Sequence, residues 1–324
     1  MNIWFIYIVL TVLLWAMTGL IYKVGIHEYE EKNICLKYSV SVGVVFFVIS
    51  FCYLIMRNEP FSIWESAIRY WPMTVFGLLY FVINTISFNG FIYNEVTVEV
   101  PVEGISGGTS IVLLIAVYFI MGRVDSISKL FTPLRTIGML MIFFSIILLS
   151  FVRNSEAAGM DESEEDVPQK RWTRTGLGTL IFPVMFAMVD SLETVVTGVC
   201  LDTTYGYSMP AGDSIIIIGM EYSLLAFGCW IYIFVRERQV YNPFRKENLP
   251  RLLGSVTDNI GIVFYSYAMA IDSVSTDPVL AVYPLFAMIG GRIFLKEKVS
   301  KIQYIAAACI VAGSVLVVTD AIVV

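Results

Sequence analysis

Apolar residues run along this chain in ten long stretches that are separated by polar segments. The stretches span residues 3–25, 34–56, 71–93, 98–121, 131–152, 175–200, 211–235, 250–271, 275–295 and 302–320. A membrane helix needs about 20 such residues to cross a hydrocarbon core of about 30 Å. The runs are continuous, whereas the strands of a membrane barrel are about ten residues long and alternate in polarity. The pattern therefore predicts an all-α membrane protein with ten transmembrane helices.

The composition supports a lipid rather than an aqueous environment. Hydrophobic residues make up 57% of the 324 residues, and charged residues make up only 15%. With a mean hydropathy of +0.77, these values exceed those of a soluble globular domain. The first stretch lacks a basic n-region and a small-residue cleavage site, so we expect it to be a retained helix and not a signal peptide.

An acidic segment divides the ten stretches into two sets of five. Six acids lie within the eleven residues from Glu156 to Asp166, a density typical of a solvated linker. We therefore expect a first five-helix repeat at 1–152, an acidic polar linker at 153–174 and a second five-helix repeat at 175–324. Because five is odd, the second copy enters the membrane in the opposite sense, which is the inverted-repeat arrangement of many secondary transporters.

Two weak sequence echoes accompany this division. Leu14–Met17 is similar to Met185–Met188, and the spacing from Val124 to Gly138 recurs from Val299 to Gly313. The basic residues are also uneven: 16 of the 21 lie nearest the odd-numbered loops between the predicted helices. By the positive-inside rule, these loops are cytoplasmic and both termini lie on the other side. We expect a multi-pass protein of the plasma membrane.

The last fifty residues resemble a known family. The segment Gly291–Gly313, with Pro284 before it and Trp15 in the first stretch, is similar to the junction of helices nine and ten in the drug/metabolite transporter superfamily, EamA-like branch. The resemblance implies a ten-helix carrier that works by alternating access. It also implies a central cavity lined mainly by helices one, three, four, six, eight and nine.

Carboxylic acids within the apolar stretches are the strongest functional signal. Six such acids are Glu99, Glu103, Asp190, Glu193, Glu221 and Asp258. An ionised side chain at the bilayer centre costs about 2.5–3.5 kcal/mol on insertion scales, so these residues need a cavity, a partner or a proton. At about 1.5 Å per residue, Glu103 and Asp258 reach similar depths of about 10–12 Å. We expect these two acids to face each other and to bind a substrate charge or a proton.

Structural roles are the alternatives for the other acids. Glu99 also suits an interfacial helix N-terminus, where the helix dipole favours an acid. Asp190 and Glu193 could pair with Lys23 or with Ser and Thr hydroxyls. Glu221 lies in a helix that the family resemblance places outside the cavity. Pro101 and the glycines after it suit either a broken helix or close helix packing.

Aromatic and amide side chains complete the predicted site. Aromatic faces attract an organic ammonium by about 0.5–2 kcal/mol per contact, and asparagines could orient a polar substrate or bond across helices. The predicted substrate-binding residues are Glu103, Asp258, Glu99, Asp190, Glu193, Trp15, Tyr80, Asn84, Asn259, Tyr265 and Tyr283.

These features predict a secondary active transporter for a small polar metabolite, a cationic or zwitterionic amine or an amino acid, with proton linkage. The alternatives are an exchanger of nucleotide sugars or other anionic metabolites, and a non-transporting scaffold or receptor. We expect no enzyme, because no G-x-G-D motif or nucleophile and histidine set is present, and neither cofactor nor metal. The expected partners are a small-molecule substrate, protons or a counter-substrate, and the bilayer, but no nucleic acid. We expect a monomer or a homodimer.

Overall fold

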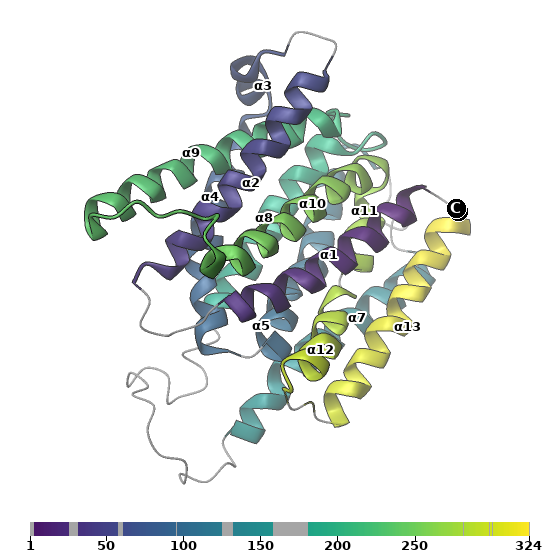
Figure 1. The fold of residues 1–324 in the computed structure, drawn as a ribbon. Coiled ribbons are helices and arrows are strands. Elements are labelled where there is room, and N and C mark those ends of the chain that lie inside the picture. Colours follow the sequence, from purple (N-terminus) through teal and green to yellow (C-terminus); the bar gives the residue numbers. More distant parts are fainter. Residues whose placement is uncertain are drawn as a thin grey trace.

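Helices form every regular element in the part of the chain that the structure describes. The computed structural model describes residues 3–25, 32–57, 61–94, 96–124, 132–157, 181–280, 282–297, 299 and 301–323. The elements of the first half are α1 (Ile3–Gly25), α2 (Ile34–Met56), α3 (Ile63–Arg69), α4 (Trp71–Tyr93), α5 (Val96–Glu103), α6 (Ile105–Ile120) and α7 (Pro133–Ala157). The elements of the second half are α8 (Ile181–Leu201), α9 (Ala211–Glu237), η2 (Lys246–Asn248), α10 (Leu249–Ile271), α11 (Ser273–Leu280), α12 (Tyr283–Phe294) and α13 (Lys301–Val323) (Figure 1).

Each predicted stretch contains a helix, but only some of these helices qualify as membrane spans by themselves. Within the described ranges, five helices are long and apolar enough to cross a membrane: α1, α2, α4, α8 and α9. The apolar parts of α6, α7 and α13 are shorter. The helix α7 continues to Ala157, past the predicted boundary at 152. The rest of the predicted acidic linker, from residue 158, lies outside the described residues.

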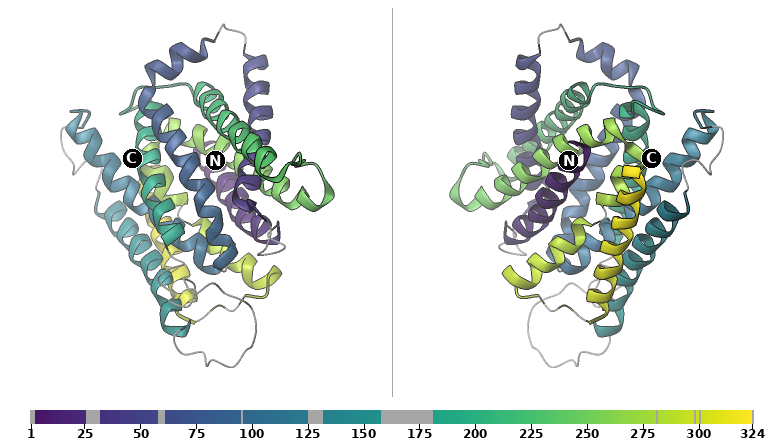
Figure 2. Two further views of the ribbon diagram at one scale, coloured as in Figure 1. Left: turned by 90° about the vertical axis from the view of Figure 1, so that its left-hand side faces the viewer. Right: turned by 90° about the vertical axis from the view of Figure 1, so that its right-hand side faces the viewer.

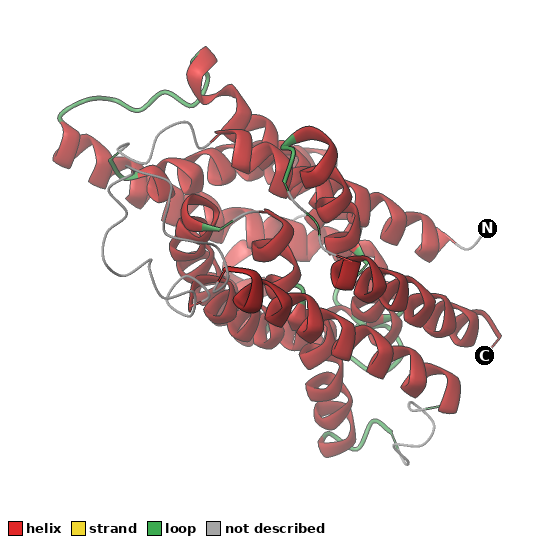
Figure 3. Ribbon diagram, turned by 90° about the horizontal axis from the view of Figure 1, so that it is seen from below, coloured by secondary structure: helices red, strands yellow, loops and turns green. Residues whose placement is uncertain are grey.

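The bundle is built from four pairs of long helices. The pairs that pack along each other are α1 with α10, α4 with α8, α2 with α9, and α7 with α13. Figures 1 and 2 show the α7 and α13 pair on one flank of the molecule and the α2 and α9 pair toward the opposite flank. Seen from below, the start of α1 and the end of α13 lie on the same side of the bundle (Figure 3).

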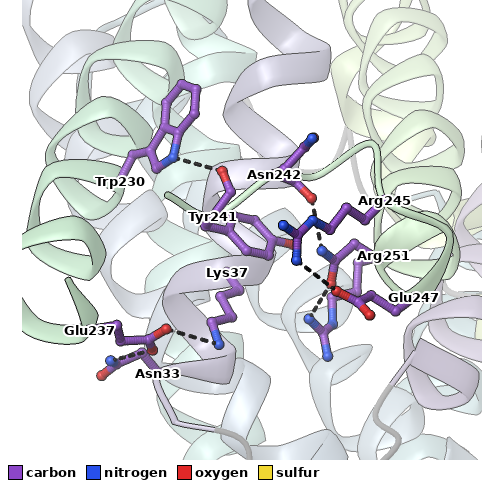
Figure 4. Close-up of polar contacts among 10 residues, drawn as sticks. Asn33, Lys37, Trp230, Glu237, Tyr241, Asn242, Arg245, Glu247 and Arg251 are labelled. Carbon is purple, nitrogen blue, oxygen red and sulfur yellow. Dashed lines mark hydrogen bonds and ion pairs between the residues drawn. The ribbon is translucent and has the colours of Figure 1, made fainter. Parts of the chain in front are cut away.

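The helices α2 and α9 run antiparallel and are tied at both ends. Near the start of α2, Lys37 pairs with Glu237 at the end of α9, with 3.4 Å between Nζ and Oε2 (Figure 4). At the other end, Arg57 pairs with Asp213 in the first turn of α9. Between the two ion pairs, glycines let the backbones approach. A Cβ at Gly43 would lie 2.8 Å from the Tyr222 carbonyl oxygen.

Two of the ten predicted stretches are interrupted. The stretch 98–121 divides into α5 and α6 at Gly104, and the stretch 275–295 divides into α11 and α12 between Leu280 and Tyr283. Both α5 and α11 are eight residues long, and each has a proline at its sixth position, Pro101 and Pro278. A break at membrane depth is tolerated where the backbone is buried in protein or lines a cavity. Gly108 also serves close packing, since a Cβ there would lie 2.8 Å from Phe143 Cδ2 of α7.

Candidate functional site

A cavity of about 140 Å³ lies where both interrupted helices meet the long helices. Its wall is formed by α1, α4, α5, α6, α8, α9, α10, α11 and α12. The resemblance implied a lining from predicted helices one, three, four, six, eight and nine, and each of these contributes. The seventh predicted helix, α9, was not among them, but it also contributes two lining residues, Ile218 and Tyr222.

The structure brings nine of the eleven predicted binding residues to this one cavity. They are Glu103, Asp258, Asp190, Glu193, Trp15, Tyr80, Asn84, Tyr265 and Tyr283. They come from six helices that lie far apart in the sequence, so only the fold assembles them. Whether they bind a substrate remains a prediction.

Two predicted residues, Glu99 and Asn259, do not line the cavity. Glu99 is fully buried and accepts a hydrogen bond from Asn94 Nδ2 at 2.5 Å. Its carboxylate lies against the backbone of Gly90, where a Cβ would overlap it. Asn259 is also fully buried, and its Nδ2 donates to the Val42 carbonyl oxygen at 2.9 Å. Glu99 therefore closes the contact between α4 and α5, and Asn259 bonds α10 to α2.

The lining carries a strongly unbalanced set of charged residues. Among the described residues that form it, five are carboxylic acids and none is lysine, arginine or histidine. Lys23 lies one turn beyond Gly19, a lining residue of α1. Its Nζ donates to the carbonyl oxygens of Phe91 and Asn94, at 2.8 and 2.7 Å. It thus holds the end of α4 and does not belong to the cavity lining.

The acids differ in how the protein holds them. Asp277 accepts from Ser110 Oγ at 2.7 Å and from the Tyr265 hydroxyl at 3.1 Å. Glu193 accepts from Thr197 Oγ1 at 2.5 Å. Two acids are therefore oriented by hydroxyl groups, as the structural alternative for Glu193 proposed.

Glu103 and Asp258 make fewer and weaker hydrogen bonds within the described residues than Asp277 and Glu193 do. Asp258 receives the Tyr22 hydroxyl at 3.5 Å, which is the outer limit of a hydrogen bond. The described residues give the Glu103 side chain no hydrogen bond or ion pair. Both carboxyl groups line the cavity, and their oxygens are thus available to a ligand.

Aromatic rings stand beside these acids. The Trp15 ring centroid lies 5.3 Å from that of Tyr265 and 5.9 Å from that of Tyr283. Trp15 Nε1 donates to the Asp258 carbonyl oxygen at 3.3 Å, which fixes the indole on α10. On another part of the wall, Tyr80 and Phe186 have ring centroids 5.5 Å apart. The arrangement offers ring faces and carboxylates to the same small volume.

The most important residue that sequence reasoning missed is Asp277. It lies two residues from the start of the predicted stretch 275–295 and was not among the six predicted intramembrane acids. The Asp277-Pro278 step inside an apolar stretch was the available signal, since a proline there predicts an interrupted helix. Tyr22 and Tyr222 also line the cavity without having been predicted.

Comparisons with known proteins agree with this architecture. No curated protein matches the chain. A solved structure described only as "Crystal structure of protein" has a TM-score of 0.61 and 16% identity, with 96% of this chain and 94% of that chain covered. At this identity, the likeness shows the fold alone. Residues 206–319 match the EamA-like transporter family model. The resemblance read from the sequence is thus confirmed: this segment is an EamA-like domain of the drug/metabolite transporter superfamily.

Proposed function

We propose that this integral membrane protein is a secondary active transporter that moves a small organic cation, or a zwitterion with an amine, by proton-linked alternating access. The EamA-like domain and the apolar helices support a membrane transporter of the drug/metabolite type. The observation that carries the substrate proposal is the cavity itself, whose described lining has five carboxylic acids and no basic side chain.

The charge of the lining favours a cation over an anion. Recognition of phosphate or carboxylate groups uses arginine and lysine donors, and the described lining supplies neither. An ammonium group would instead meet carboxylates and the ring faces of Trp15 and Tyr283, at about 0.5–2 kcal/mol per ring. A nucleotide-sugar exchanger is therefore disfavoured. A scaffold is also disfavoured, because its buried acids would pair with one another or with bases.

Proton linkage would follow from competition at the same carboxyl groups. Glu103 and Asp258 lack strong partners among the described residues, and a buried ionised carboxyl without a partner is costly. Either a proton or a substrate ammonium removes that cost. A carrier that must hold one of the two to change conformation exchanges them without ATP.

Alternating access is supported by the correspondence of the two halves. The helices α2 and α9 begin 177 positions apart, at Ile34 and Ala211, and α5 and α11 are offset by the same 177 positions. The pairing of α1 with α10 corresponds under this offset to the pairing of α8 with α4. Ten spans in two inverted repeats would explain both facts, and they would also explain why the start of α1 and the end of α13 lie on one side.

Purified protein in liposomes tests the proposal. Under an imposed pH gradient we expect uptake of a labelled amine from a panel of amines, amino acids and nucleotides, and loss of that uptake in Glu103→Gln and Asp258→Asn. Glu247→Gln, in an exposed ion pair with Arg245, is the control and should transport normally. Full gradient-driven transport by both cavity variants, or selective binding of nucleotides, would overturn the proposal.

A plasma-membrane location and a monomeric or dimeric state are part of the same proposal.

A further inference from the structure

A second buried carboxyl group lies outside the cavity, in the contact between α4 and α9. Glu221 of α9 is 6% exposed, and among the described residues neither of its side-chain oxygens has a hydrogen-bond partner. It lies directly on the backbone of α4, because a Cβ at Gly77 would overlap Oε2. Its neighbour Tyr222 lines the cavity, whereas Glu221 does not.

No basic side chain in the described part of the chain faces this carboxyl. From α4 it is faced by the Thr74 hydroxyl, and from α8 by the acid Glu193. The α2 surface near this level presents Phe46 and Ser50, which do not titrate. Other ionisable groups around α9 include the phenols Tyr80 and Tyr222 and the acid Asp258 at the cavity, Lys37 bound to Glu237 and Arg57 bound to Asp213 at the two ends of the α2 and α9 contact, and the exposed Glu65 and Arg69 of α3.

The geometry around Thr74 fits a protonated carboxyl group. Thr74 Oγ1 donates its single proton to the Ala67 carbonyl oxygen, at 3.4 Å. While that bond is kept, the hydroxyl can accept from Glu221 but cannot donate to it, and a hydroxyl turned away from Ala67 would instead donate to the ionised group. A carboxylic acid can donate and an ionised carboxylate cannot. In the ionised form, Glu221 would be an unpaired charge in an apolar contact, and water or movement of α4 would be needed to stabilise it.

We propose that Glu221 is a proton-binding site, separate from the cavity, whose ionisation loosens the contact between α4 and α9. Both helices carry cavity residues next to this contact. Tyr80 of α4 stacks on Tyr222 of α9 with 6.4 Å between ring centroids and 14° between ring planes. Loosening would therefore move two aromatic residues of the wall. This role in transport rests on the proposed function, whereas the proton site itself does not.

Two measurements on purified protein in nanodiscs test the site without any substrate. Infrared spectra recorded across a pH titration should show a protonated carboxyl band that is absent in Glu221→Gln. Hydrogen exchange should give the second readout. At each pH, the exchange rate of segments 74–81 and 218–226 in the native protein is divided by the rate in Glu221→Gln. This ratio should rise several-fold from acidic to alkaline pH. Segments of α7 and α13 should keep a constant ratio.

Glu221→Gln is a matched variant because the amide has the shape of the neutral acid, can donate to Thr74 and cannot ionise. Identical carboxyl bands in both proteins, or an exchange ratio that stays constant in every segment, would overturn the proton site. Failure of amine transport in liposomes, with both signatures present, would instead overturn the proposed function and leave the proton site standing. If transport depends on Glu103 and neither the carboxyl band nor the exchange ratio depends on Glu221, the proton site is rejected and the proposed function stands.

Discussion

Gly138 of α7 and Gly313 of α13 approach each other reciprocally. A Cβ at either position would lie 2.6 Å from the carbonyl oxygen of the other residue. The two glycines occupy equivalent places in the spacing that recurs from Val124 and from Val299. Membrane helices gain little from hydrophobic burial and associate through this kind of close backbone contact. The crossing of α7 and α13 therefore depends on the absence of two side chains.

Gly138→Leu should separate these two helices. The leucine would meet the Gly313 carbonyl and the Val317 side chain, and overpacking typically costs about 1–3 kcal/mol. The thermal unfolding midpoint in detergent should fall. Gly228→Leu is the control, because a Cβ at that helical position has nothing within 4 Å, and its midpoint should stay close to that of the native protein. Equal midpoints for both variants would contradict the crossing.

Two cavity acids should differ in their effects: Asp277 should matter for stability and Glu103 for ligand binding. Asp277→Ala removes a hydrogen-bond acceptor of two buried hydroxyl groups, those of Ser110 and Tyr265, and each such bond contributes about 0.5–1.5 kcal/mol. We expect a lower unfolding midpoint. Glu103→Gln breaks no hydrogen bond in the described residues, so its midpoint should change little while amine binding is lost. Thermal unfolding with and without a panel of amines measures both effects, and a large loss of stability in Glu103→Gln would show that Glu103 has a structural role.

Much of the helix order follows from the sequence because lipid demands long, continuous apolar segments. The direction in which each side chain points does not. Asp258 and its neighbour Asn259 lie in the same stretch, yet only Asp258 reaches the cavity. The two carboxylates at the head of stretch 98–121 also differ: Glu99 turns to Gly90, and Glu103 turns to the cavity. Helix rotation depends on neighbours that a single stretch does not reveal.

Equivalent positions in the two proposed repeats were equally hard to identify from the sequence. The similarity of Leu14–Met17 to Met185–Met188 implies an offset of 171, but α1 and α8 begin 178 positions apart, at Ile3 and Ile181. That echo therefore differs by seven positions from the offset between the starts of these two helices. Apolar side chains that face lipid or a generic packing surface are interchangeable, so short matches among them carry little information. Gly138 and Gly313 carry more information than such matches, because each lies in close contact with the backbone of the other.

Two ion pairs that differ in exposure should contribute unequally to the stability of the fold. Arg57 and Asp213 retain 25% and 12% side-chain exposure, whereas Arg245 and Glu247 retain 65% and 68%. Exposed pairs contribute about 0–1 kcal/mol, and burial reduces their screening by solvent. A double-mutant cycle with Arg57→Gln and Asp213→Asn should therefore give the larger coupling. The same cycle at Arg245 and Glu247 should give a coupling near zero that vanishes in high salt. A reversed order would mean that the α2 and α9 contact does not rely on its ion pair.

The indole of Trp15 should be displaced by one methyl group on α10. A Cβ at Gly261 would lie 2.5 Å from Trp15 Nε1, and the ring also bonds to the Asp258 carbonyl. Gly261→Ala should push the ring away from α10, break this bond and reduce the volume left for a ligand. Amine affinity should fall, and the tryptophan fluorescence should shift.

Trp15→Phe separates these effects. It keeps an aromatic face but removes the N–H donor, so it should retain part of the amine affinity and should cancel the fluorescence shift caused by Gly261→Ala in the double variant. Gly228→Ala, at an open position of α9, controls for the general effect of alanine in a helix. If Gly261→Ala keeps full amine affinity, the Trp15 face does not contact the ligand, and recognition must rest on the carboxylates and the tyrosines of the opposite wall.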